Sequence, residues 1–363
     1  MQKNCPENER IKRDYFAYLK EAKQHSEPTV DAAAKALRRF EEYTRHRNFK
    51  AFHYQQAVSF KAHLASQKAQ RTGEKLSKAT LHQTMTQLKR FFQWLAWRPG
   101  YKSCFKYSDA DYFNLSEKDT RIATARREQQ TPTIEQIEHV LRTMPATTEI
   151  ERRNRDLIAF TLLTGARDSA IASMKLKHVD MVAGRVHQDG RDVKTKFSKT
   201  FNTYFFQAGD SVLQILRDWV GFLKSEKLWG NDDPLFPATR VAPGVDCQFV
   251  AIGLERAHWS SASPIRTIFK DAFQGAGLPY FHPHSFRRTL GNIGLNRCKS
   301  AEEFKAWSQN FGHENVLTTL QNYGSVSSNR QTEIMRRLTP ERETKTSSEE
   351  AIVQAVLREI RKA

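Results

Sequence analysis

The sequence predicts a mainly α-helical protein with a small antiparallel β-sheet, divided into two domains. Its 363 residues exceed what one hydrophobic core usually supports, which favours two domains. Apolar residues recur at helical spacing along most of the chain, and only residues 185–206 alternate in the manner of β-strands. Composition suggests a first domain over 1–98, a linker over 99–130, a second domain over 131–338 and a tail over 339–363.

The chain is strongly basic, with 58 Lys and Arg against 40 Asp and Glu and a net charge of +18. This excess favours a polyanionic partner and salt-dependent binding. A basic surface that serves only solubility is the alternative. The widely spaced Cys5, Cys104, Cys247 and Cys298 fit reduced intracellular thiols. With no apolar leader and no stretch of about 18 apolar residues to span a membrane, we expect a cytoplasmic protein without membrane contact.

The first domain contains only helical patterns. One apolar stripe consists of Val30, Ala33, Leu37, Phe40 and Tyr43, and a second of Leu81, Met85, Leu88, Phe92 and Leu95. Ser77 is a candidate N-cap for the second helix. Lys89 and Arg90 lie off the second stripe, where they are either simply solvated or contact phosphates.

The linker expected over 99–130 opens with Pro99-Gly100 and ends in a basic run that includes Arg126 and Arg127. The second domain then opens at Thr133, which has capping-box spacing to Gln136. The tail, beyond a polar break at Thr339-Pro340, predicts a terminal amphipathic helix.

A packed helix over Glu149–Thr164 precedes Gly165, which suits the left-handed residue that commonly ends a helix. Arg167 follows two residues later, at a position where an arginine often serves only the helix dipole and the surface. Further on, Gly190 marks a turn within residues 185–206. That turn leads into a run with three lysines: Lys194, Lys196 and Lys199. Residues 227–263 contain Pro and Gly and are predicted to be irregular.

Most of the candidate catalytic side chains lie in residues 281–323. His284 and Arg287 stand three apart, on one face of a helix. His313 follows a glycine, and Tyr323 ends a short polar helix. Guanidinium groups match the charge that gathers on a phosphoryl group under attack. A tyrosine hydroxyl can attack phosphorus and hold a covalent intermediate, provided that nearby cations or a base offset its usual pKa of about 10.

Other phosphate chemistry lacks support in the sequence. Neither G-x-x-x-x-G-K nor G-x-G-x-x-G occurs, so nucleotide hydrolysis and dinucleotide binding are not indicated. No His-Glu-x-x-His motif or aspartate cluster supplies metal ligands. We therefore expect no cofactor and no metal.

Five pieces together carry a family resemblance. These are Thr164-Gly165-Ala166-Arg167, the basic hairpin, His284-Ser285-Phe286-Arg287, Gly312-His313 and Tyr323. In order and spacing they resemble the tyrosine recombinase (phage-integrase) family over about residues 129–326. The resemblance implies a helical core-binding domain, a catalytic domain, and site-specific recombination of double-stranded DNA by a homotetramer. A bacterial member would be associated with the nucleoid.

The resemblance also implies catalytic roles. Tyr323 would attack a DNA phosphodiester and form a 3′-phosphotyrosyl link, while Arg167 and Arg287 clamp the phosphate. His313 would donate a hydrogen bond to a non-bridging oxygen, and His284 would assist proton transfer.

Lys194 would protonate the departing 5′-oxygen, with Lys196 as the alternative two residues on. In the family the linker runs along the DNA and the C-terminal helix often docks on the neighbouring protomer; packing on its own domain is the alternative. The remaining expected DNA contacts are Lys89, Arg90, Arg126, Arg127, Lys196 and Arg288.

Two features depart from the family pattern. An acidic residue usually stands three positions after the first arginine, where this chain has Ala170; Asp168 could replace it only with a different local backbone. Arg288 occupies a position where the family often has histidine. Tyr280 is a rival nucleophile, but it precedes the arginine motif.

Two alternative functions remain. A type IB topoisomerase shares this chemistry but relaxes DNA as a monomer. A DNA-binding protein with an inert site belongs to a different class, although all six expected site residues are present.

Overall fold

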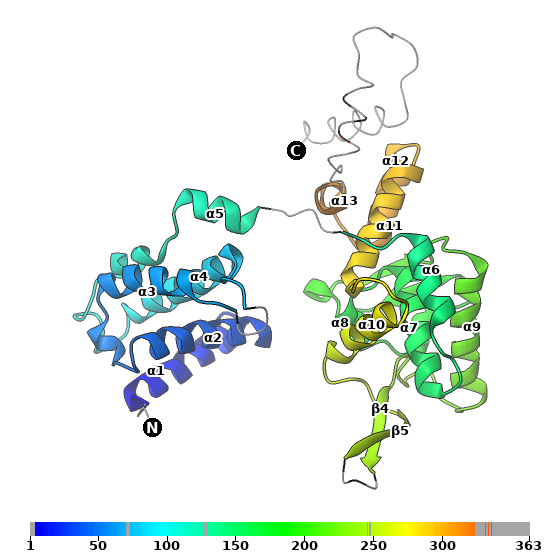
Figure 1. Ribbon diagram of the computed structural model, residues 1–363, viewed down its shortest axis with the longest axis horizontal. Helices are drawn as coiled ribbons and strands as arrows, with labels where there is room; N and C mark the ends of the chain where they lie inside the picture. Colours follow the sequence, from blue (N-terminus) through cyan, green and yellow to red (C-terminus); the bar gives the residue numbers. More distant parts are fainter. Residues whose placement is uncertain are drawn as a thin grey trace. The chain divides into compact units, whose positions relative to one another are not determined.

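The computed structural model describes residues 4–69, 73–125, 130–244, 246 and 248–323, together with 331, 333 and 335. The chain separates into two compact units, residues 1–127 and 128–363 (Figure 1). Helices dominate both units, and the strands are short and antiparallel. The predicted fold class is therefore confirmed. No helix within the described ranges is both long and apolar enough to cross a membrane.

The first unit is a helical bundle. Its α-helices are α1 (Pro6–Ala17), α2 (Glu27–Tyr43), α3 (Tyr54–Ser66), α4 (Lys78–Leu95) and α5 (Glu117–Thr124), with a π-helical turn at Tyr18–Ala22 and 3₁₀ turns at Phe49–Ala51 and Tyr107–Phe113. Both predicted apolar stripes face the core, and Ser77 caps α4 by accepting from the amide of Thr80. At its centre, the ring of Phe92 stacks on Phe52 at 3.9 Å and meets Phe40 edge-on at 5.4 Å.

Much of the predicted linker belongs to this bundle instead. Phe105, Ala110 and Phe113 are buried in the same core, because their apolar side chains cover α3 and α4. Polar contacts also hold the segment in place. They are Lys61 Nζ to Asn114 O at 2.9 Å, Lys78 Nζ to Asp119 at 2.8 Å and Lys89 Nζ to Asp111 at 2.8 Å. The first unit thus extends well past residue 98, to residue 127, and includes most of the segment 99–130 that was expected to be a linker.

The second unit surrounds a larger core. Its α-helices are α6 (Ile134–Thr143), α7 (Glu149–Thr164), α8 (Asp168–Ile171), α9 (Asp210–Ser225), α10 (Ser263–Gly275), α11 (Pro283–Arg297), α12 (Ala301–Asn310) and α13 (Val316–Tyr323). Helix α7 runs through the centre, and its residues from Asp156 to Thr164 are all buried. Capping boxes open α6 at Thr133, as predicted, and α7 at Thr148.

Two antiparallel sheets complete this unit. Strands β1 (Val179–Asp180), β2 (Arg185–Gln188) and β3 (Phe201–Tyr204) form one sheet, as the alternation within 185–206 predicts. A separate ribbon, β4 (Ala238–Pro243) with β5 (Phe249–Glu255), projects from the unit (Figure 1). The prediction of irregular structure over 227–263 was wrong here, because the Pro and Gly residues sit at the ribbon's turn and bulge rather than breaking the strands.

Candidate active site

The end of α7 determines the position of Arg167, the first arginine of the site. Gly165 has φ +57°, the left-handed conformation that a helix-ending glycine adopts. A Cβ there would lie 3.0 Å from the Phe311 ring, so glycine also permits close packing. Arg167 follows two residues later as the half-buried N-cap of α8. The predicted helix end is confirmed.

Arg287 holds the site together from α11. Its side chain is only 2% exposed. Nη1 donates to the carbonyl oxygen of Gly165 at 2.8 Å, and Nη2 donates to the carbonyl oxygen of Phe311. Nη2 also lies 3.2 Å from Nε2 of His313, and the guanidinium carbon lies 4.6 Å from the centroid of the Phe311 ring. One side chain thereby joins the end of α7 to the loop that carries His313.

Hydrogen bonds determine which ring nitrogen of the buried His313 carries the proton. An arginine nitrogen can only donate, so Nε2 of His313 accepts from Arg287 and Nδ1 carries the proton. Nδ1 then donates to Thr319 Oγ1 at 2.7 Å, and Thr319 Oγ1 lies 2.6 Å from Ser308 Oγ. Burial, followed by the charges of Arg287 and Arg167, lowers the pKa of His313 to about 3. His313 is therefore neutral at pH 7.

His284 occupies the first turn of α11, one turn before Arg287. The ring reaches solvent, yet partial desolvation and then the charges of Arg287 and Arg288 lower its pKa to about 4. Arg288 is half-buried, and its Nε has no hydrogen-bond partner among the described residues. His284 is thus also neutral at pH 7, in surroundings that favour an anion.

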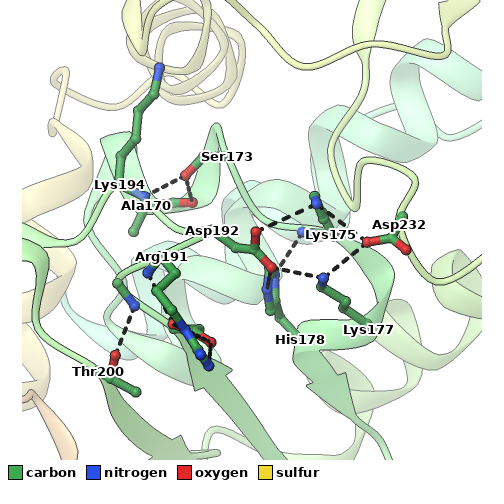
Figure 2. A network of polar contacts seen from close by, with 12 residues as sticks. Ala170, Ser173, Lys175, Lys177, His178, Arg191, Asp192, Lys194, Thr200 and Asp232 are labelled. Atoms are coloured by element: carbon green, nitrogen blue, oxygen red, sulfur yellow. Dashed lines mark hydrogen bonds and ion pairs between the residues drawn. The ribbon is translucent and has the colours of Figure 1, made fainter.

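Lys194 lies in the loop between β2 and β3, and its backbone is tied to α8. Its amide donates to Ser173 Oγ at 2.8 Å, and its carbonyl oxygen accepts from Ser169 Oγ at 3.3 Å. Its side chain is exposed and extends away from the neighbouring polar network (Figure 2). These bonds place the backbone of Lys194 beside the short helix that Arg167 begins.

Lys196 and Lys199 lie further along the same loop. Nζ of Lys196 lies 4.9 Å from the centroid of the exposed Phe197 ring. Lys199 pairs with Glu314 at 2.6 Å. Both ammonium charges help to lower the pKa of His313, so both lie within electrostatic range of that side chain. Lys199 was not among the expected site residues, although its place in the lysine-rich run could have indicated it.

The position that carries an acid in the family is filled differently here. Ala170 is buried, and the carboxylate of Asp168 pairs with Arg266 Nε at 2.8 Å. The rival nucleophile Tyr280 is exposed near this pair, and partial burial raises its pKa, which disfavours the phenolate. Its environment therefore lacks the activation that a nucleophile needs.

Tyr323 is the last residue of α13, which packs against α11 and α12. The buried Thr319 lies one helical turn before it. Among the expected DNA contacts, Arg90 is exposed, whereas Lys89 is engaged with Asp111 and Asn114. Arg126 and Arg127 lie outside the described residues, as does the predicted tail helix.

Taken together, the described side chains create a site for an anion. Two neutral histidines lie among arginine and lysine charges that act on them at short range. Bound negative charge would relieve the repulsion among these cations.

Two family models match the sequence. The model described as "Phage integrase family" matches residues 131–330, and "Phage integrase, N-terminal SAM-like domain" matches residues 13–99. Among curated proteins, tyrosine recombinase XerC of Lactobacillus leichmannii is 23% identical over 326 residues, covering 87% of this chain and 94% of the relative. The XerC of Bacillus pumilus is 22% identical over 315 residues, covering 86% and 90%.

Solved structures share the fold at low sequence identity. A lambda integrase dimer bound to a COC′ core site has a TM-score of 0.59 at 13% identity, covering 93% of this chain and 80% of that one. The Tn1549 transposon integrase in complex with transposon right end DNA has a TM-score of 0.54 at 16% identity, covering 90% and 99%. The family models and the curated relatives disfavour the two alternative functions, and the chain belongs to the phage integrase family of tyrosine recombinases.

Proposed function

We propose that this protein is a site-specific DNA recombinase that cuts and rejoins double-stranded DNA through a 3′-phosphotyrosyl intermediate. The observation that carries the proposal is the buried Arg287, which joins the end of α7 to the His313 loop. Such a rigid, cationic arrangement suits a phosphodiester whose charge grows in the transition state.

In the proposed reaction, Tyr323 Oη attacks phosphorus and gives its proton to the neutral imidazole of His284. The bond from Oη to phosphorus forms as the bond from phosphorus to the 5′-oxygen breaks. The leaving 5′-oxygen takes a proton from a lysine of the β2–β3 loop, with Lys194 as first candidate and Lys196 as second. Religation is the reverse, with a 5′-hydroxyl attacking the phosphotyrosine. His284 assists the proton movements.

The clamp consists of Arg167, Arg287 and His313. Nε2 of His313 now accepts from Arg287, so a hydrogen bond from Nε2 to phosphate requires the other tautomer. Thr319 can supply it, because its hydroxyl can turn to donate to Nδ1 while Ser308 donates to Thr319. His313 can thus become a donor while remaining neutral.

Double-stranded DNA is the proposed partner. The net charge of +18 supports it, and the matching integrase structures are complexes with DNA. Arg90, Lys196 and Arg288 are proposed DNA contacts. Arg126, Arg127 and Lys89 are further candidates, Lys89 only after release from Asp111. Four protomers would assemble on two DNA sites, at the nucleoid of a bacterial cell.

A nicked suicide substrate tests the proposal. A short nicked strand diffuses away after cleavage and traps the covalent protein–DNA adduct, so the wild type should accumulate it. Tyr323→Phe removes one hydroxyl, so it should bind DNA with unchanged affinity and form no adduct. Tyr280→Phe, the control, should form the adduct normally. An adduct with Tyr323→Phe, or none with the wild type on the DNA flanking its own gene, would overturn the proposal.

A further inference from the structure

A network of charged side chains lies at the base of the lysine-bearing loop. We call Lys175, Lys177, His178 and Asp192 the Asp192 cluster (Figure 2). Asp192 contacts Lys177 Nζ at 2.8 Å, Lys175 Nζ at 3.7 Å and His178 Nε2 at 3.6 Å. Asp232 holds the same two lysines from outside, at 2.9 Å from Lys177 and 3.3 Å from Lys175.

The protonation states of the cluster are fixed by its hydrogen bonds. The amide of Lys175 donates to Nδ1 of His178 at 3.0 Å, so a neutral His178 carries its proton on Nε2, toward Asp192. Burial lowers the pKa of His178, which favours this neutral form. The hydrogen bond from Lys177 lowers the pKa of Asp192, which keeps its carboxylate ionised. The positive charges of Lys175 and Lys177 are thus balanced by the negative charges of Asp192 and Asp232.

Asp192 stands only two residues before Lys194. The amides of Asp192 and Val193 both donate to the carbonyl oxygen of Asp189, and the Val193 side chain is buried in the core. Directly after it, the amide of Lys194 donates to Ser173 Oγ. Ser173 is itself buried, and its hydroxyl lies 3.1 Å from the carbonyl oxygen of Ala170. The chain is therefore held at three consecutive residues.

These contacts lie around the position where the family acid is missing. Ala170 cannot make a polar side-chain contact to the lysine loop, whereas the hydroxyls before and after it do. Without such bonds, an exposed loop of lysines would sample many backbone conformations. A general acid misplaced by about 1 Å can lose about 100-fold in rate.

We propose that Asp192 and Ser173 are positioning residues for the general-acid lysine of this recombinase. Asp192 anchors the start of the loop to Lys175 and Lys177, and Ser173 fixes the backbone of Lys194 beside α8. Neither touches DNA or the reacting atoms; both act through the lysine. The inference rests on the proposed function, which supplies the acid that they position.

Single-turnover cleavage of Asp192→Asn and Ser173→Ala tests the inference, on DNA with a normal 5′-bridging oxygen and on DNA with sulfur there. Sulfur leaves without needing a proton. Both variants should cleave normal DNA about 10- to 100-fold more slowly than wild type and regain most of the rate on the thio substrate. Arg191→Ala is the control, because the hydrogen bonds and the ion pair described for the Arg191 side chain go to Asp189 in the same loop and not to the Asp192 cluster. It should cleave both substrates at the wild-type rate.

Lys194→Ala and Lys196→Ala are measured alongside. Adding Asp192→Asn to whichever lysine variant the thio substrate rescues should slow it by less than about 2-fold, because the acid is already absent. Thermal unfolding midpoints show whether each variant is folded. If a lysine variant is rescued but Asp192→Asn and Ser173→Ala are fully active, or equally slow on both substrates, the inference is overturned. If no lysine variant is rescued, the acid assignment in the proposed function fails instead.

Discussion

The guanidinium of Arg287 and the imidazole of His313 form a buried pair in which both groups are held from the far side. Arg287 is fixed by two backbone carbonyl oxygens, and His313 by the hydroxyl of Thr319. Each side chain therefore faces the other in one orientation before any phosphate binds. Preorganisation of this kind lowers the reorganisation cost of the transition state.

Arg287→Lys should separate charge from geometry. Lysine keeps the charge but lacks the planar fork through which two separate nitrogens of Arg287 donate to Gly165, Phe311 and His313. We expect single-turnover cleavage to fall by at least about 100-fold, while DNA affinity changes by less than about 3-fold. Arg297→Lys, at the exposed end of the same helix, is the control and should keep full activity. Wild-type cleavage by Arg287→Lys would mean that the fork geometry is not used.

Thr319→Val should expose the role of the hydroxyl chain. Valine preserves the shape but leaves buried polar atoms of His313 and Ser308 without their partner, which costs about 1–3 kcal/mol of unfolding free energy. It also removes the donor that could switch the tautomer, so cleavage should fall by about 10-fold.

The matched controls for Thr319 are Thr319→Ser, which keeps a hydroxyl, and Thr318→Val, on the neighbouring residue of α13. Both should cleave within about 3-fold of wild type in the same assay. An equal loss in Thr318→Val would instead indicate general damage to the helix.

Stability should fall as the pH decreases below neutrality. His284 and His313 have folded-state pKa values lowered to about 4 and about 3, against about 6.5 in an unfolded chain. Between pH 6.5 and 4 the unfolded state binds these protons first, so the unfolding free energy decreases as the pH falls. Urea denaturation at pH 7.5, 6 and 5 measures it. His313→Gln should show a weaker dependence than wild type, whereas His139→Gln, at an exposed position on α6, should retain it.

The choice between Lys194 and Lys196 can be decided by the leaving group. If Lys194 is the acid, Lys194→Ala should cleave normal DNA roughly 100- to 10,000-fold slowly and recover on 5′-thio DNA. Lys196→Ala should then show a modest loss on both substrates, as expected for a phosphate contact. Rescue of Lys196→Ala alone would assign the role two residues further along.

The sequence was sufficient to predict most of the helices and to recognise the site motifs by their order. Gly165 ends α7 as predicted, because the residue that ends a helix often has a left-handed backbone conformation, which strongly favours glycine. The 99–130 linker was predicted from Pro99-Gly100 and scattered aromatics, but Phe105 and Phe113 pack into a core formed by residues far away in sequence. Local composition does not reveal such packing.

Sequence motifs could not identify the residues that contact the candidate site residues and hold them in place. Ser173, Asp192 and Thr319 are common residue types, and each becomes informative only through its partner's position in the fold. The ribbon of β4 and β5 was missed for a related reason, since its Pro and Gly residues are also typical of loops.

The amide side chain of Asn310 has a consequence for solubility. Strand β3 is an edge strand, and edges of this kind invite pairing with another chain. Asn310 accepts from the amide of Tyr204 at 2.6 Å and donates to its carbonyl oxygen at 2.8 Å, as a neighbouring strand would. One side chain thus occupies the hydrogen-bonding position that a foreign strand would need, and protects a site-bearing sheet from aggregation by its edge.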